Sequence, residues 1–300
     1  MKFKGIIPPV ASIFHADETL NTQGMANMID ALITGGVDGL FFLGSAGEVA
    51  HMTDALRQET MEFSIAHTNK RLPTLVGAIA CSTRETIAYA KAAEKAGADG
   101  VVLLNPYYAA MTEEALYKHF ATVAESISIP SVLYNLPGTS GQSLSVDLVK
   151  KLALNVPSIC GLKDTVDTIS HIRAVITAIK PERPEFAVFC GFDEYLAVTM
   201  LIGGDGCVPA SANFAPHLTC GIYKAYQKKD WATIEKLQRM LSHVPPLYSM
   251  GPPFYAAMKE AIKISGVDIT TDVLRPALPA DAATKEAVAA MMKKVDPKLL

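Results

Sequence analysis

Short apolar runs alternate with longer amphipathic stretches over most of this chain. Eight apolar runs rich in β-branched residues cover 5–14, 39–45, 72–79, 100–108, 130–137, 158–165, 186–193 and 206–211. The stretches between them have helical spacing, most clearly at 53–67 and 82–96, where Thr53 and Ser82 stand at the expected N-caps. Continuous apolar runs, rather than strict alternation, indicate strands that are buried on both faces. The pattern therefore predicts a repeated strand–helix unit around a parallel sheet.

Three short joints support this repeat. The pattern Gly-x-Asp-Gly occurs at 36–39, 97–100 and 203–206, each time where a helical pattern ends and a strand begins. Glycine supplies the left-handed residue that ends a helix and turns the chain into the next strand. Eight units are the number in a (β/α)8 TIM barrel, which is the fold we expect. A doubly wound open sheet is the alternative, but no G-x-G-x-x-G motif follows the first strand.

No linker-like segment divides the chain, so we expect one continuous body. Residues 1–229 are expected to form the (β/α)8 barrel catalytic domain. Residues 230–300 are expected to form a C-terminal helical extension packed on the barrel, with helices near 231–243, 252–265 and 281–294.

Composition narrows the class of protein and its partners. Half of the residues are hydrophobic and 19% are charged, which is enough to bury a large core. The net charge of -3 predicts neither nucleic-acid nor anionic-membrane binding. No apolar run approaches the roughly 18–20 residues that cross a membrane, and Pro8 and Pro9 interrupt the N-terminal run that a signal peptide would need. Five scattered cysteines indicate free thiols in a reducing compartment, so we expect a cytoplasmic protein.

Polar residues collect where the expected strands end, and the C-terminal ends of barrel strands are where active sites lie. Lys163 lies toward the end of the sixth apolar run, and Tyr134 lies toward the end of the fifth. Apolar walls disfavour the ammonium form of a lysine, and a neutral amine can attack a ketone to form an imine. Lys163 is therefore the candidate nucleophile, and Tyr134 is the candidate proton-transfer group. The alternative is an ordinary solvated lysine on the surface.

The turn Gly44-Ser45-Ala46-Gly47 is a candidate carboxylate site. Its backbone N–H groups and its hydroxyl form an arrangement that suits an anion. An ordinary turn between strand and helix explains the same tetrapeptide, and the sequence leaves both readings open.

Together these motifs resemble the pyruvate-dependent class I aldolase family that includes dihydrodipicolinate synthase and N-acetylneuraminate lyase. The matching motifs are G-S-A-G-E at 44–48, N-P-Y-Y at 105–108, Y-N-L-P at 134–137, G-L-K-D at 161–164 and G-F-D-E at 191–194. They follow the family's order and span nearly the whole chain. The resemblance implies that Lys163 forms a Schiff base with pyruvate, without a separate cofactor or metal, and that Tyr134 transfers protons. It also implies a homotetramer arranged as a dimer of dimers.

The resemblance assigns further roles around the expected imine. Ser45 and the amide of Ala46 would hold the pyruvate carboxylate, although the family often has threonine at the latter position. Tyr108 would reach toward the site of a neighbouring subunit. Val208 would place its carbonyl near the imine.

Departures from the family pattern bear on the substrate. Thr139 stands where the synthase branch has an arginine for the carboxylate of its second substrate, and a hydroxyl does not replace a bidentate guanidinium. Gly191, Asp193 and Glu194, together with Thr165, are candidates for binding the hydroxyls of a sugar chain. The two acidic residues at the start of a helix also favour its dipole, which is the structural alternative.

The resemblance is greatest to 2-keto-3-deoxygluconate-type sugar-acid aldolases, although Ala210 replaces a serine of the lyase branch. The expected function is reversible cleavage of a 2-keto-3-deoxy sugar acid to pyruvate and an aldehyde. The alternatives are synthase-like or lyase-like activity, a dehydratase that uses the same imine, and a pyruvate-binding regulatory protein on the same scaffold. A metal-dependent aldolase would need clustered ligands, and the seven histidines show no H-x-H or H-E-x-x-H pattern.

Overall fold

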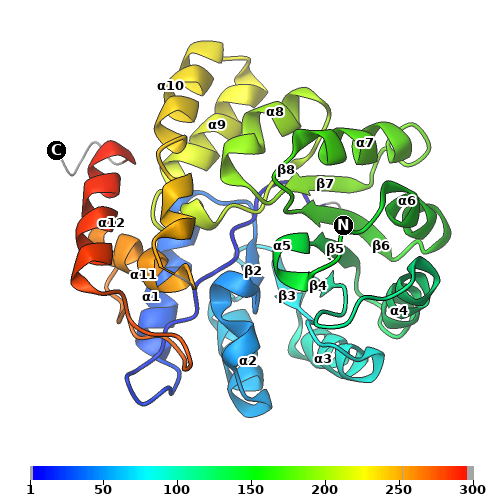
Figure 1. Ribbon diagram of the computed structural model, residues 1–300, viewed down its shortest axis with the longest axis horizontal. Coiled ribbons are helices and arrows are strands. Elements are labelled where there is room, and N and C mark those ends of the chain that lie inside the picture. The colour runs from blue at the N-terminus through cyan, green and yellow to red at the C-terminus, as the bar shows by residue number, and fades with distance from the viewer. Residues whose placement is uncertain (1–2, 252, 296–300) are drawn as a thin grey trace.

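Eight parallel strands form a ring at the centre of the molecule, and helices surround it (Figure 1). The computed structural model describes residues 3–251 and 253–295. The strands are β1 Gly5–Ile6, β2 Leu40–Phe42, β3 Thr74–Gly77, β4 Gly100–Leu104, β5 Ser131–Asn135, β6 Ile159–Asp164, β7 Ala187–Cys190 and β8 Gly206–Cys207. From β2 to β8 each strand pairs with the next in sequence, and β1 pairs with β8. The expected (β/α)8 barrel is confirmed.

The ring closes between β1 and β2 just beyond the first strand. Phe41 donates its N–H to the carbonyl of Pro8 over 3.0 Å and accepts from the N–H of Val10 over 2.8 Å. β1 itself is shorter than the expected run 5–14, because Pro8 and Pro9 have no N–H for a ladder.

The helices follow the strands in alternation. They are α1 Thr22–Gly35, α2 Asp54–Thr68, α3 Thr83–Ala96, α4 Glu113–Glu125, α5 Pro137–Ser140, α6 Val146–Asn155, α7 Ile169–Ile179, α8 Leu196–Leu201, α9 Pro216–Lys228, α10 Trp231–Leu241, α11 Tyr255–Ile264 and α12 Ala282–Val295. The expected N-caps are confirmed, since the hydroxyls of Thr53 and Ser82 accept from the N–H groups of Leu56 and Glu85. None of the described helices is both long enough and apolar enough to cross a membrane.

The three Gly-x-Asp-Gly joints share one geometry at the N-terminal ends of the strands. The first glycine of each is left-handed, with φ of 81° at Gly36, 90° at Gly97 and 97° at Gly203. The aspartate of each joint then accepts the N–H of a residue on the preceding strand. These pairs are Asp38 with Ile6 over 2.8 Å, Asp99 with Thr74 over 2.9 Å, and Asp205 with Val188 over 2.9 Å. The repeat therefore anchors each of these helix–strand turns to the preceding strand of the barrel.

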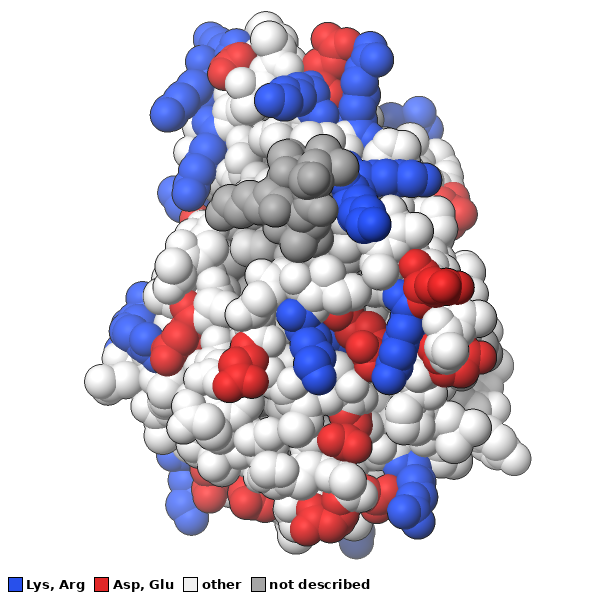
Figure 2. All heavy atoms as spheres, turned by 90° about the vertical axis from the view of Figure 1, so that its left-hand side faces the viewer, with Lys and Arg blue, Asp and Glu red and all other residues white. Residues whose placement is uncertain are grey.

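The expected helices after residue 230 form as α10, α11 and α12, and they lie beside α1 and α9 at one side of the barrel (Figure 1). Figure 2 views the molecule from this side, where basic and acidic side chains are interspersed. The segment between α10 and α11 contains a 3₁₀ turn, Pro245–Ser249, and contributes to the cavity described below.

Candidate active site

A cavity of about 240 Å³ lies at the C-terminal ends of the strands. Of the described residues that line it, Lys163 is the only one with a basic or acidic side chain. The other lining residues are Pro9, Ser45, Ala46, Tyr134, Leu136, Thr139, Thr165, Gly191, Phe192, Val208, Ala210, Tyr248 and Phe254. The lining is thus largely apolar with a few hydroxyl groups, which is typical of a small-molecule site.

Lys163 and Tyr134 lie side by side at the base of this cavity. β5 and β6 pair in parallel with Tyr134 opposite Lys163. Lys163 is 4% exposed, and its Nζ lies 3.9 Å from the centre of the Tyr134 ring and 5.2 Å from that of Phe41. The rings of Phe41 and Tyr134 meet edge to face at 6.4 Å. The amine is therefore enclosed by two aromatic walls, as the apolar sequence around it predicts.

The turn after β2 presents Ser45 and Ala46 to the same cavity. It forms a 3₁₀ turn, Ser45–Gly47, that continues into Glu48 with a left-handed φ of 61°. The Glu48 side chain points away into the core and pairs with Lys259. The buried pair fixes the end of this turn relative to α11.

Asp193 takes a different place from the one expected of a sugar ligand. It is 1% exposed, and it accepts the N–H groups of Ala210 over 3.1 Å and Ser211 over 3.0 Å. The hydroxyl of Tyr248 donates to the same carboxyl group over 2.5 Å. Burial raises the pKa of Asp193. Its oxygens therefore join the end of β7 to the segment after β8, rather than lining the cavity.

Glu194 also lies outside the cavity lining. Its carboxyl group is half-buried, and burial raises its pKa. One of its oxygens, Oε2, is buried without a hydrogen-bond partner among the described residues.

Thr165 and Gly191 meet at the cavity wall. The Oγ1 of Thr165 is buried and has no hydrogen-bond partner in the described structure. A Cβ on Gly191 would lie 1.9 Å from that oxygen, so glycine is required for the close approach.

Val208 and Tyr108 are the remaining site residues expected from the sequence, and only Val208 lines the cavity. Val208 is 4% exposed and lines the cavity. Tyr108 has a φ of 76° and a fully exposed side chain, outside the lining of the cavity. The single chain therefore brings together Ser45, Ala46, Tyr134, Lys163, Thr165, Gly191 and Val208, but not Tyr108, Asp193 or Glu194.

Two aromatic lining residues come from outside the strand ends and were not expected from the sequence. Tyr248 and Phe254 come from the segment between α10 and α11 and pack edge to face at 5.5 Å. No motif or spacing relates them to the strand ends. The signal available was only the presence of aromatic residues in a Pro- and Gly-rich connection.

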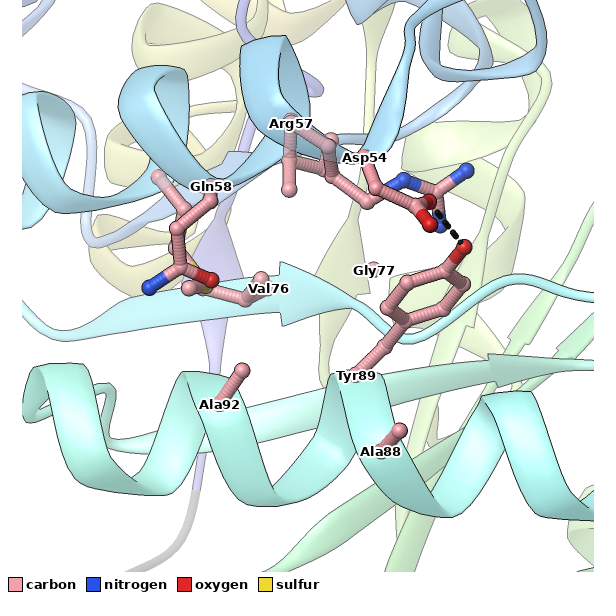
Figure 3. Close-up of a pocket in the computed structure, with 10 residues that line it drawn as sticks. Asp54, Arg57, Gln58, Val76, Gly77, Ala88, Tyr89 and Ala92 are labelled. Atoms are coloured by element: carbon pink, nitrogen blue, oxygen red, sulfur yellow. Dashed lines mark hydrogen bonds between the residues drawn. The ribbon is translucent and has the colours of Figure 1, made fainter.

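A second cavity, of about 220 Å³, lies on the outside of the barrel between α2 and α3 (Figure 3). The guanidinium of Arg57 stacks over the ring of Tyr89 at 4.0 Å, and the Tyr89 hydroxyl donates to Asp54 over 2.6 Å. None of the expected site residues lines it. Within the described ranges, no three His, Cys, Asp or Glu side chains gather as a metal site would require.

An eight-stranded parallel barrel with a lysine-containing cavity at the C-terminal ends of its strands defines a (β/α)8-barrel enzyme. Residues 2–295 match the model of the dihydrodipicolinate synthetase family, and the chain belongs to that family. It is a carbon–carbon lyase, and the expected family is confirmed.

Among its relatives are two proteins of Escherichia coli K12. The first, named "Putative 2-dehydro-3-deoxy-D-gluconate aldolase YagE", is 42% identical over 98% of this chain and 97% of its own length. The second, named "Probable 2-dehydro-3-deoxy-D-pentonate aldolase YjhH", is 42% identical over 96% of this chain and 95% of its own.

Solved structures agree with the fold. The crystal structure of YagE in complex with pyruvate matches with a TM-score of 0.97 at 42% identity, covering 99% of both chains. Dihydrodipicolinate synthase from Thermotoga maritima matches with a TM-score of 0.94 at 25% identity over the whole of both chains.

Proposed function

We propose that this chain is a class I aldolase that cleaves a 2-keto-3-deoxy sugar acid to pyruvate and an aldehyde, reversibly. The observation that carries the proposal is the buried amine of Lys163 beside Tyr134 in a cavity whose remaining polar side chains are hydroxyls. The assigned activities of YagE and YjhH, both on 2-dehydro-3-deoxy sugar acids, support it.

In the proposed reaction the Lys163 amine attacks the C2 ketone, and loss of water gives an imine. The protonated imine withdraws the electrons of the C3–C4 bond while the C4 hydroxyl loses its proton, which releases the aldehyde. The enamine then takes a proton at C3, and water frees pyruvate and regenerates the lysine. Tyr134 is the group proposed to move these protons. The lysine supplies the electron sink itself, so the proposal includes no separate cofactor.

The rest of the lining suits a neutral hydroxylated chain. We assign Ser45 and the amide of Ala46 to the pyruvate carboxylate, Val208 to the neighbourhood of the imine, and Thr165 beside Gly191 to a substrate hydroxyl. Thr139 lines the cavity where the synthase branch would have an arginine, so a second carboxylate finds no cation there.

We further propose that a second copy of the chain completes the site, in a homotetramer. Tyr108 is fully exposed in the single chain, so its ring is free to contact another subunit. Its position beyond the end of β4 agrees with a role that reaches outward, toward a neighbouring subunit.

Borohydride reduction in the presence of pyruvate, followed by peptide mass spectrometry, tests the imine. The wild type is expected to carry a pyruvyl adduct on the peptide with Lys163, and Lys163→Ala is expected to carry none. Lys259 is an internal control, because it is equally buried but occupied by an ion pair. Absence of an adduct on the wild type would refute the mechanism. Among 2-keto-3-deoxy acids, N-acetylneuraminate and aspartate semialdehyde with pyruvate, turnover is expected for the keto-deoxy acids alone.

A further inference from the structure

We propose that His171 is a positioning residue for the Lys163–Tyr134 pair, and that it acts as an imidazolium held between Asp164 and the carbonyl of Leu144. The catalytic part of this proposal rests on the proposed function, whereas its structural part rests only on the geometry of the strand ends.

Four residues behind the cavity form a closed ring of hydrogen bonds. Asn135 donates its amide to Oδ1 of Asp164 over 2.9 Å, and Oδ2 of Asp164 lies 2.7 Å from Nδ1 of His171. Nε2 of His171 lies 3.0 Å from the carbonyl oxygen of Leu144. The N–H of Leu144 closes the ring by donating to Oδ1 of Asn135 over 3.0 Å. Asn135, Asp164 and Leu144 are fully buried.

This ring lies next to the proposed reacting pair. In the parallel register of β5 and β6, Asn135 stands opposite Asp164 one step beyond Tyr134 and Lys163. Successive side chains of a strand point to opposite faces. Lys163 and Tyr134 therefore face the cavity, while Asp164 and Asn135 face the helix layer, where α7 supplies His171. The ring holds the two strand ends together from the outside, and it also holds the chain at Leu144, before α6.

The ring of hydrogen bonds requires both nitrogens of the His171 imidazole to be donors. Both nitrogens of His171 face oxygen atoms, and a neutral imidazole has only one N–H. An imidazolium satisfies both contacts and neutralises a carboxylate that burial would otherwise penalise. Asp164 on β6 is the charged group that acts on His171 among the described residues, and its hydrogen bond raises the pKa of His171. A neutral pair, in which Asp164 carries one of the two protons and His171 the other, would satisfy the same contacts. The NMR measurement described below distinguishes this pair from the imidazolium.

The hydrogen-bond ring, and with it the turnover, is expected to depend on pH. The folded pKa of His171 is raised above the ordinary value of about 6.5. The interaction is therefore fully present below that ordinary value and is lost as pH rises through the folded value. When the imidazolium of His171 loses one proton, one of its ring nitrogens no longer has an N–H to donate. One hydrogen bond of the ring is then lost, so we expect the ends of β5 and β6 to be held less firmly and turnover to fall at alkaline pH.

Nitrogen NMR on protein labelled with ¹⁵N-histidine tests the charge without any assay of activity. The resonances of His171, assigned by their absence in His171→Asn, are expected to show two protonated nitrogens at pH 7. A single protonated nitrogen at pH 7 would overturn the imidazolium.

Kinetics test the positioning role. His171→Asn is expected to lower kcat by about 10- to 100-fold, with little change in KM, because small displacements of reacting groups cost rate more than affinity. Its pH–rate profile is expected to lose the alkaline decline that reflects His171. The matched control is His67→Asn, which breaks a similar His–Asp contact of 3.0 Å on the surface, and it is expected to leave kcat within about twofold.

Wild-type kcat and an unchanged pH profile in His171→Asn would overturn the positioning role. If that variant does not fold, the His171 resonances are assigned by elimination, with single replacements of the other six histidines, and the NMR titration of the wild type then decides the charge. A wild-type profile without an alkaline decline overturns the kinetic part. Failure of the proposed function is separate, since it appears as a missing pyruvyl adduct on the wild type.

Discussion

Replacing Lys259 with methionine isolates a carboxylate in the core of this protein. The Nζ of Lys259 lies 2.5 Å from Oε1 of Glu48, and both side chains are 0% exposed. Lys259 also donates to the carbonyl of Asp272 over 2.6 Å, and the N–H of Leu274 donates to Glu48 over 2.8 Å. The pair therefore connects the turn after β2 with α11 and the segment that follows α11.

The expected cost is large because the partner stays buried. Removal of one member of a buried ion pair costs about 3–5 kcal/mol in the free energy of unfolding. Burial raises the pKa of Glu48 and lowers that of Lys259, so desolvation works against both charges even when they are paired. Replacing both residues, as Glu48→Gln with Lys259→Met, removes the charges together and is expected to recover most of that loss. This comparison separates the penalty of a lone charge from the contribution of the pair.

Denaturant unfolding followed by circular dichroism measures these differences. The matched control is Lys285→Met, because Lys285 pairs with Glu260 at 3.5 Å from a half-exposed position. We expect that variant to lose less than about 1 kcal/mol. The reasoning fails if Lys259→Met unfolds within about 1 kcal/mol of the wild type, which is the size of a surface pair. It also fails if the double variant is no more stable than Lys259→Met.

Three further predictions concern the cavity wall, acid stability and the thiols. Gly191→Ala places a Cβ 1.9 Å from Oγ1 of Thr165, so it is expected to cost about 1–3 kcal/mol and to raise KM; unchanged unfolding and KM would contradict this contact. Burial lowers the pKa of His119 to about 4, so the unfolded chain binds a proton that the folded chain does not, and stability falls as pH drops from 6.5 toward that value. His119→Phe should flatten this part of the stability curve, and an unchanged curve would refute the assignment. Cys81 is the exposed thiol, Cys160 is partly buried and the other three are buried, so a thiol reagent should label Cys81 first in the native protein and all five after denaturation. Labelling of another cysteine before Cys81 would contradict this order.

The barrel could be predicted because its strands are buried on both faces, and strands of this kind have continuous apolar sequences. The ends of those runs were less informative. β4 ends at Leu104, before the end of the apolar run 100–108. Pro106 has no N–H with which to extend the ladder, so the last residues of the run lie beyond the strand. Burial continues past the ladder only as far as Pro106, and Tyr108, the last residue of the run, is fully exposed.

The cavity was predictable where it is made of strand ends, and not elsewhere. Lys163 and Tyr134 line one cavity because the barrel brings every C-terminal strand end to one face. Tyr248 and Phe254 approach it through a tertiary contact of the C-terminal segment, which no local pattern encodes. Asp193 seemed free as a strand-end carboxylate in sequence, yet its partners, Ala210, Ser211 and Tyr248, come from distant positions.

The end of β6 combines two environments on adjacent residues. Lys163 faces the cavity, where its Nζ lies over the Tyr134 ring, whereas Asp164 faces the helix layer, where Asn135 and His171 bond its carboxyl oxygens. One step along a strand reverses the direction of a side chain, so these opposite environments lie within a single dipeptide. The amine and the fully bonded carboxylate therefore lie on opposite faces of β6 and do not pair with each other. If Asp164 instead faced the cavity, its carboxylate would be placed to pair with the amine that the proposed reaction uses as its nucleophile.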